Sequence, residues 1–164
     1  MTSRPLDLLR ERFADAGLYG TRVALHSVAT QPLPYADYLA NLVLFQVESV
    51  ADLQQVAAAE VYRVTRPCGG VAVIACPDVL RSDTETWLAA GGIARSEWER
   101  VDQGYRIRRG ELPGAGVWTH QYADAGRSGA SNEQRVRLPL KTLWFGGLGP
   151  ADIVSRHYRT PSPL

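Results

Sequence analysis

Three stretches of the chain place apolar residues at the three- and four-residue spacing of an amphipathic helix. Leu6, Leu9 and Phe13 show this spacing most clearly, and Gly17 follows them as a suitable C-terminal cap. Ser82 stands three residues before a glutamate, which is the arrangement of a helix-capping pair. The predicted helices span residues 3–16, 50–64 and 82–90.

Apolar runs between these helices predict strands. Residues 39–46 (LANLVLFQ) and 71–76 (VAVIAC) are almost continuously apolar, which is typical of strands buried on both faces. Residues 22–27 (RVALHS) alternate apolar and polar positions and are expected to form a further strand. A hairpin is expected from two short strands around Gly104, at residues 98–101 and 105–109.

The order of these elements predicts an α/β fold. Buried strands separated by helices are typical of a largely parallel sheet, and right-handed crossovers restrict its topology to a few arrangements. We therefore expect a compact α/β domain over residues 1–110.

Composition agrees with one folded domain in a chain of 164 residues, of which 45% are hydrophobic and 21% charged. The net charge of +1 gives no indication of a nucleic-acid or anionic membrane partner. No apolar run is long enough to span a bilayer, and the charged residues in positions 1–20 are unlike a signal peptide. We therefore expect a cytoplasmic chain.

Glycine and proline become frequent near residue 110. Residues 110–164 hold 8 Gly and 5 Pro, whereas residues 1–109 hold 12 of the two together. This density predicts turns and short strands, so residues 111–164 are expected to form a β-rich, turn-rich arm or linker.

Two motifs around the predicted strand 39–46 carry a family resemblance. The loop Leu33-Pro34-Tyr35 precedes the strand, and the following helix closes on a turn that holds Arg63, Pro67, Gly69 and Gly70. This order resembles the C-terminal half of the class I S-adenosylmethionine-dependent methyltransferase domain. It implies a partial Rossmann-like sheet. Cys68 stands where the family usually has a glycine.

The resemblance also implies where a cofactor would bind. It identifies Leu33, Pro34 and Tyr35 as a loop at the cofactor cleft. The family's other contacts are a glycine-rich loop after the first strand and acidic residues after the second and third. The sequence has no GxGxG, and residues 27–31 contain no acid. The domain is therefore expected to be N-terminally incomplete, and S-adenosylmethionine is implied by resemblance alone.

A second resemblance lies in the arm. The segment 116–122, which contains Trp118-Thr119-His120, begins it, and the segments 135–140 and 143–147 and the pair Arg156-His157 continue it. Together they look like the lead-in to quinoprotein-like (pyrroloquinoline-quinone-like) β-propeller repeats in large bacterial proteins, where a methyltransferase-like domain precedes the blades. That resemblance implies an exported parent protein.

Single residues give weaker hypotheses. His26, His120 and His157 are scattered, and with Cys68 and Cys76 they form no metal-ligand spacing. The histidines are expected to be structural or solvated. The arginines at 106, 108 and 109 fit an exposed strand face better than a nucleic-acid stripe.

Three functions follow from these patterns. The first is methyl transfer from S-adenosylmethionine, weak or absent for this chain alone and with no catalytic residue to name. The second is a non-catalytic scaffold or docking module for a quinoprotein-like propeller, a protein partner or a second copy that completes open sheet edges. The third is a segment with no independent role. The absent cofactor contacts favour the second.

Overall fold

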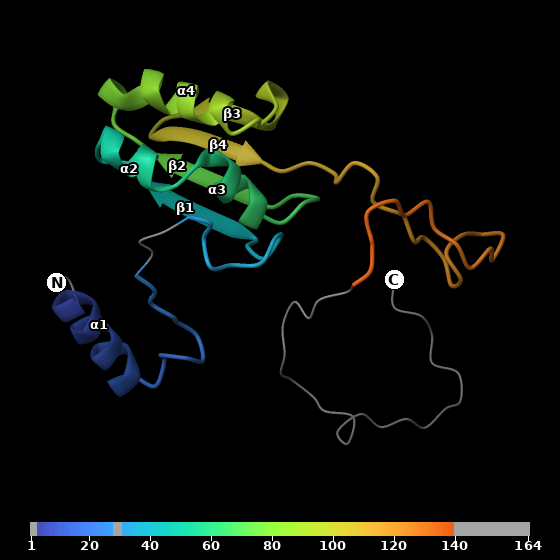
Figure 1. The fold of residues 1–164 in the computed structure, drawn as a ribbon, viewed down its shortest axis with the longest axis horizontal. Helices are drawn as coiled ribbons and strands as arrows, with labels where there is room; N and C mark the ends of the chain where they lie inside the picture. Colours follow the sequence, from blue (N-terminus) through green and yellow to red (C-terminus); the bar gives the residue numbers. More distant parts are fainter. Residues whose placement is uncertain (1–2, 28–30, 140–164) are drawn as a thin grey trace.

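The computed structural model describes residues 3–27 and 31–139, which form a mixed α/β structure with an open four-stranded sheet (Figure 1). The predicted helix at the N-terminus, both apolar strands, the helix near residue 85 and the hairpin are confirmed. The helices and strands are α1 (Ser3–Asp15), β1 (Leu42–Gln46), α2 (Val50–Gln55), α3 (Ala58–Val64), β2 (Val71–Ala75), η1 (Asp78–Leu80), α4 (Arg81–Ala90), η2 (Arg95–Glu97), β3 (Trp98–Val101) and β4 (Gly104–Arg108).

The sheet has the order β1-β2-β4-β3. Strands β1 and β2 are parallel, from Leu42 opposite Val71 to Gln46 opposite Ala75, and α2 and α3 connect them. Strand β4 is antiparallel to both β2 and β3. The sheet is therefore mixed rather than largely parallel, since β1, β2 and β3 run in one direction and β4 runs against them. The two-residue turn at Asp102 and Gln103 returns the chain antiparallel, as a short hairpin connection requires.

The core lies on one face of the sheet. Val43 and Phe45 of β1 share this face with Ala72 and Ile74 of β2, and Phe45 stacks on Trp87 of α4 with ring centroids 5.5 Å apart. Helices α2 and α3 contact α4 along it. Thirteen buried residues form this core: Val47, Leu53, Ala58, Val61, Ala72, Ile74, Cys76, Trp87, Leu88, Ile93, Trp98, Tyr105 and Ile107.

The opposite face of β1 is open to solvent. Leu42 and Leu44 point to it and are 57% and 73% exposed. The prediction that residues 39–46 are buried on both faces is therefore wrong, because β1 is an edge strand and the helices cover a single face. Helix α1 lies apart from the sheet in Figure 1, and its Leu8 and Leu9 are also exposed.

The predicted strand at residues 22–27 is not formed. The backbone folds into a turn instead, in which Val23 donates to the carbonyl of Leu18 and accepts from the amide of Gly20. The Arg10 guanidinium of α1 donates two hydrogen bonds to the carbonyl of Leu25. Alternation of apolar residues predicted a strand, but local bonds use the groups that a neighbouring strand would have needed.

The predicted helix at residues 50–64 is two helices. Val56 and Ala57 have extended backbone angles between α2 and α3. The Trp87 indole N–H donates to the carbonyl of Val56 at 2.8 Å, so α4 holds the break in place. A serine-led capping pair does occur, but at α2, where the Asp52 carboxylate accepts from the amide of Ser49. The predicted cap at Ser82 is wrong.

The described part of the arm, residues 111–139, contains turns and one isolated bridge between His120 and Ala123. No strand forms in that stretch, so the β-rich prediction is wrong there. The segments expected at 143–147 and around His157 lie outside the described residues. The arm leaves the sheet at the end of β4, as Figure 1 shows.

Candidate functional site

Arg63 of α3 joins the two segments that carry the methyltransferase resemblance. Its guanidinium donates to the carbonyls of Leu33 and Tyr35 at 3.1 and 2.8 Å. It also donates to the Asp37 carboxylate at 2.7 Å and twice to the Glu60 carboxylate, each time at 2.8 Å. The loop that precedes β1 is therefore held on the helix that follows β1.

Glu60 completes this contact from the helix side. One of its oxygens accepts from the amide of Leu33 at 2.7 Å, so the carboxylate binds the loop as well as the guanidinium. The hydrogen bonds from Arg63 hold the pKa of Glu60 below its ordinary value, and those from Glu60 and Asp37 raise the pKa of Arg63. Both groups are therefore charged at neutral pH, and their role is structural.

An apolar groove runs between this loop and β1. It has a volume of about 340 Å³. Leu33 and Tyr35 line it, whereas Pro34 of the same loop does not. The remaining lining residues are Leu39, Ala40, Leu42, Val43, Leu44 and Val64. The structure thus brings two of the three predicted cleft residues to the exposed side of the edge strand, where the surface suits an apolar chain segment.

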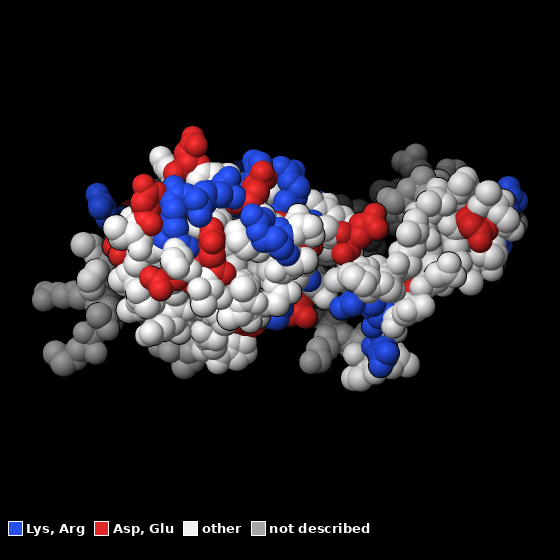
Figure 2. All heavy atoms as spheres, turned by 90° about the horizontal axis from the view of Figure 1, so that it is seen from above, with Lys and Arg blue, Asp and Glu red and all other residues white. Residues whose placement is uncertain are grey.

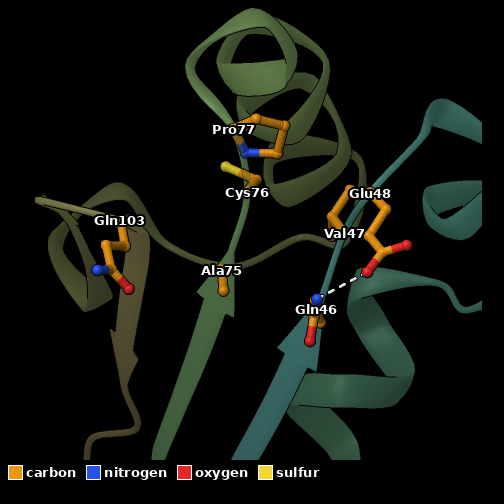
Figure 3. Close-up of a pocket in the computed structure, with 7 residues that line it drawn as sticks. All are labelled: Gln46, Val47, Glu48, Ala75, Cys76, Pro77 and Gln103. Atoms are coloured by element: carbon orange, nitrogen blue, oxygen red, sulfur yellow. Dashed lines mark hydrogen bonds between the residues drawn. The ribbon is translucent and has the colours of Figure 1, made fainter.

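A second hollow lies at the carboxyl ends of β1 and β2 and has a volume of about 560 Å³ (Figure 3). Gln46 and Glu48 lie on one side, joined by a 2.7 Å hydrogen bond from the amide of Gln46. Cys76 and Gln103 lie on the other. Open α/β sheets bind ligands at the carboxyl ends of parallel strands, so this is where a small substrate would enter. The hollow is wide open, and its polar groups are amides and one carboxylate.

The turn after α3 shows why its residue types matter. Cys68 has a φ of 58° and Gly69 a φ of 106°, both in the left-handed region that favours glycine. A Cβ at Gly70 would lie 2.1 Å from the carbonyl oxygen of Arg66, so that position excludes every other residue. The turn directs the chain into β2. Cys68 is the residue in it whose backbone is strained, because it is not a glycine and yet has a positive φ.

Arg109 is a buried residue that the sequence pattern assigned to an exposed strand face. It is 7% exposed and its guanidinium lies between the rings of Tyr38 and Tyr62, 4.7 and 4.2 Å from their centroids. It donates to three carbonyls at the end of α3, including that of Thr65 at 2.7 Å. A positive charge at the C-terminal end of a helix is stabilising. In the sequence, the signal for the burial of Arg109 is the presence of Tyr38 and Tyr62, two aromatic residues on which an arginine can stack.

The histidines take local roles. His26 stacks on Tyr35 with ring centroids 5.6 Å apart, and His120 lies 2.9 Å from the hydroxyl of Thr119. His157 lies outside the described residues. Within residues 3–27 and 31–139, no cluster of three or more metal-ligating side chains occurs.

Acidic and basic side chains are interspersed over the face drawn in Figure 2. Arg100 of β3 pairs with Glu85 of α4, and Arg81 of α4 pairs with Asp78 of η1. On the open face of the sheet Arg106 pairs with Glu99. None of the described helices is long and apolar enough to cross a membrane.

The fold and these surfaces define an open-edged α/β domain whose clearest surface feature is an apolar edge strand. Compared with known proteins, the chain matches no family model, no curated protein and no solved structure.

Proposed function

We propose that this chain is a methyltransferase-like α/β domain without its cofactor half, and that it acts as a docking module through the edge of β1. The observation that carries the proposal is the exposed apolar edge. Leu42 and Leu44 are more than half exposed, and they continue into the groove that Leu33 and Tyr35 line. Apolar surfaces of this kind mark interaction sites.

The methyltransferase-like part of the proposal is supported by the contact between its two motifs. Arg63 and Glu60 bind the loop at 33–35, so the two motifs are in contact although they lie at least 27 residues apart in the sequence. The parallel pair β1 and β2, with helices in its crossover, is the unit from which Rossmann-like sheets are built. In the family, the strands of the glycine-rich half would lie beside β1.

The docking part of the proposal is supported by the chemistry of that edge. A cofactor site of this family needs backbone amides at a glycine-rich helix start and a carboxylate for the ribose hydroxyls. The groove beside β1 offers apolar side chains instead. Apolar surface and an open strand edge favour a peptide strand over a charged nucleoside.

Methyl transfer is the second candidate function, and the hollow in Figure 3 favours it. Methyl transfer needs two reactants held in line, so the protein's contribution is chiefly positioning. Glu48 and Gln103 would orient a methyl acceptor there. The cofactor would lie against the edge of β1, held by a glycine-rich half of the domain that another chain or another segment supplies. The resemblance of the arm at 116–157 implies a β-propeller partner, and such a partner would fit the docking function rather than methyl transfer.

Calorimetric titration of the chain with S-adenosylmethionine and S-adenosylhomocysteine separates the two functions. The docking proposal expects no heat of binding from protein shown to be folded by circular dichroism. A micromolar dissociation constant, about −8 kcal/mol, would overturn it and establish a cofactor site in this chain. Leu33→Asp, which places a charge in the apolar groove, should then weaken binding more than Val79→Asp, a control at an exposed residue outside it.

A further inference from the structure

We propose that the occupant of the β1 edge is β1 of a second copy of this chain, paired antiparallel about a two-fold axis at Leu44. The two sheets would then join into one continuous sheet. This inference rests on the docking function proposed above and names its partner. It is argued from the backbone groups of β1, from their register, and from the charges on the two sheet edges.

The backbone of β1 leaves alternate residues unpaired among the described parts of the chain. The amide of Val71 donates to the carbonyl of Asn41, and the amide of Val47 donates to the carbonyl of Ala75. The backbone N–H and C=O groups of the odd-numbered residues of β1 therefore point toward β2, since each strand of a parallel ladder bonds to its neighbour through every second residue. Leu42, Leu44 and Gln46 direct their N–H and C=O groups outward.

A single symmetric register satisfies all of these groups. Opposite residues of an antiparallel pair have a constant sum of residue numbers. With Leu44 opposite Leu44 of the partner subunit, that sum is 88, and Leu42 lies opposite Gln46 of the partner subunit. Each of the three outward residues then meets another outward residue, and each such pair exchanges two hydrogen bonds. Shifting the axis by one residue leaves an outward residue of the strand without an outward partner within it.

The two edges of the sheet differ in their protection against such pairing. Strand β3, the other edge, carries Glu99 and Arg100. Strand β1 reads LVLFQ and carries neither a charge nor a proline. Natural edge strands usually carry a charged residue or a proline, which prevents pairing with another chain. Because β1 has neither, its edge is open to a partner strand.

A second copy suits this edge because the edge is complementary to itself. Leu44 would pack on Leu44 of the partner subunit across the strands, on the open face where it is now 73% exposed. No charge of β1 would face a like charge, and the net charge of +1 gives little long-range repulsion between copies. The groove beside Leu42 would take up apolar surface next to the new strand.

Sedimentation velocity over a concentration series tests the association. The mass is expected to rise from 18.0 kDa toward twice that value as the protein is concentrated from micromolar to near-millimolar. Leu44→Lys places two ammonium groups across the axis and is expected to raise the dissociation constant at least ~30-fold. Val79→Lys is the matched control, since Val79 is 85% exposed and lies in η1. A chain that remains monomeric, or equal effects of the two lysines, would overturn the proposal.

The register has its own test in cysteine variants and a short bis-maleimide cross-linker. Both variants carry Cys68→Gly, which removes the exposed thiol and suits the positive φ. In the dimer, the Leu44→Cys pair lies about 5.5 Å apart between Cα atoms, whereas the Leu42→Cys pair is about 14 Å apart along the strand. Leu44→Cys is expected to cross-link and Leu42→Cys is not. The reverse result would overturn the register. Cofactor binding is measured separately, so failure of the dimer and failure of the docking function are distinguishable.

Discussion

Replacing Arg63 with alanine is expected to release the loop before β1 and to destabilise the whole domain. The guanidinium makes five hydrogen bonds, which connect α3 to the carbonyls of Leu33 and Tyr35 and to two carboxylates. After truncation, the carboxylate of Glu60 keeps one donor among the described residues, the amide of Leu33. The loop carbonyls lose their partner as well.

The magnitude follows from the burial of the groups involved. The side chains of Arg63 and Glu60 are 25% and 14% exposed, so removing the cation leaves a largely desolvated carboxylate. Breaking a fully buried pair costs 3–5 kcal/mol, and solvent at these exposures reduces that value to about 2–3 kcal/mol. Asp37 is 57% exposed and adds little.

Urea unfolding followed by far-UV circular dichroism measures this loss. A midpoint roughly 1–2 M lower is expected for Arg63→Ala at neutral pH, from the free energy above and an ordinary denaturant slope. Arg66→Ala is the control, since Arg66 is exposed just after the end of α3 and its truncation should change the free energy of unfolding by less than about 0.5 kcal/mol.

The effect of Arg63→Ala should also depend on pH. Arg63 lowers the pKa of Glu60 in the folded state below its ordinary value of 4.5. The stabilisation is therefore complete above that value and is lost as the pH falls through the folded-state pKa. The difference between the natural chain and Arg63→Ala should narrow in acid. Equal losses for the two arginine variants, or a difference that does not change with pH, would refute this reasoning.

Three further predictions concern stability. Arg109→Ala should cost about 3 kcal/mol in urea unfolding because it leaves helix-end carbonyls unpaired and opens the space between two tyrosine rings, whereas the exposed Arg108→Ala should cost little. Cys68→Gly should stabilise the chain by about 0.5–1 kcal/mol in thermal unfolding, since the φ of 58° suits glycine. Trp87→Phe should cost about 2 kcal/mol because the carbonyl of Val56 loses its donor.

The sequence predicted those elements whose residues carry their own signal. Periodic apolar residues placed α1, and the run at 71–76 placed β2. The turn at 67–70 was foreseen because proline and glycine restrict or extend the allowed backbone angles locally. The contacts of Arg63 with the loop at 33–37 were not foreseen, since they join residues far apart in the chain.

Other features depend on tertiary contacts that a pattern of residues does not contain. The apolar run of β1 reads as a buried strand, but its burial depends on which neighbours pair with it. The break at Val56 depends on an indole from α4. Arg109 reads as a surface residue, and its burial follows from carbonyls and aromatic rings that other elements supply.

Amide hydrogen exchange along β1, measured by nuclear magnetic resonance, tests the open edge most directly. In dilute solution the amides of Val43 and Phe45, which face β2, should exchange at least ~10-fold more slowly than those of Leu42, Leu44 and Gln46. Raising the concentration should then slow the second set as strands pair. Equal protection of both sets in dilute, monomeric protein would mean that the chain covers its own edge, and it would contradict the docking function.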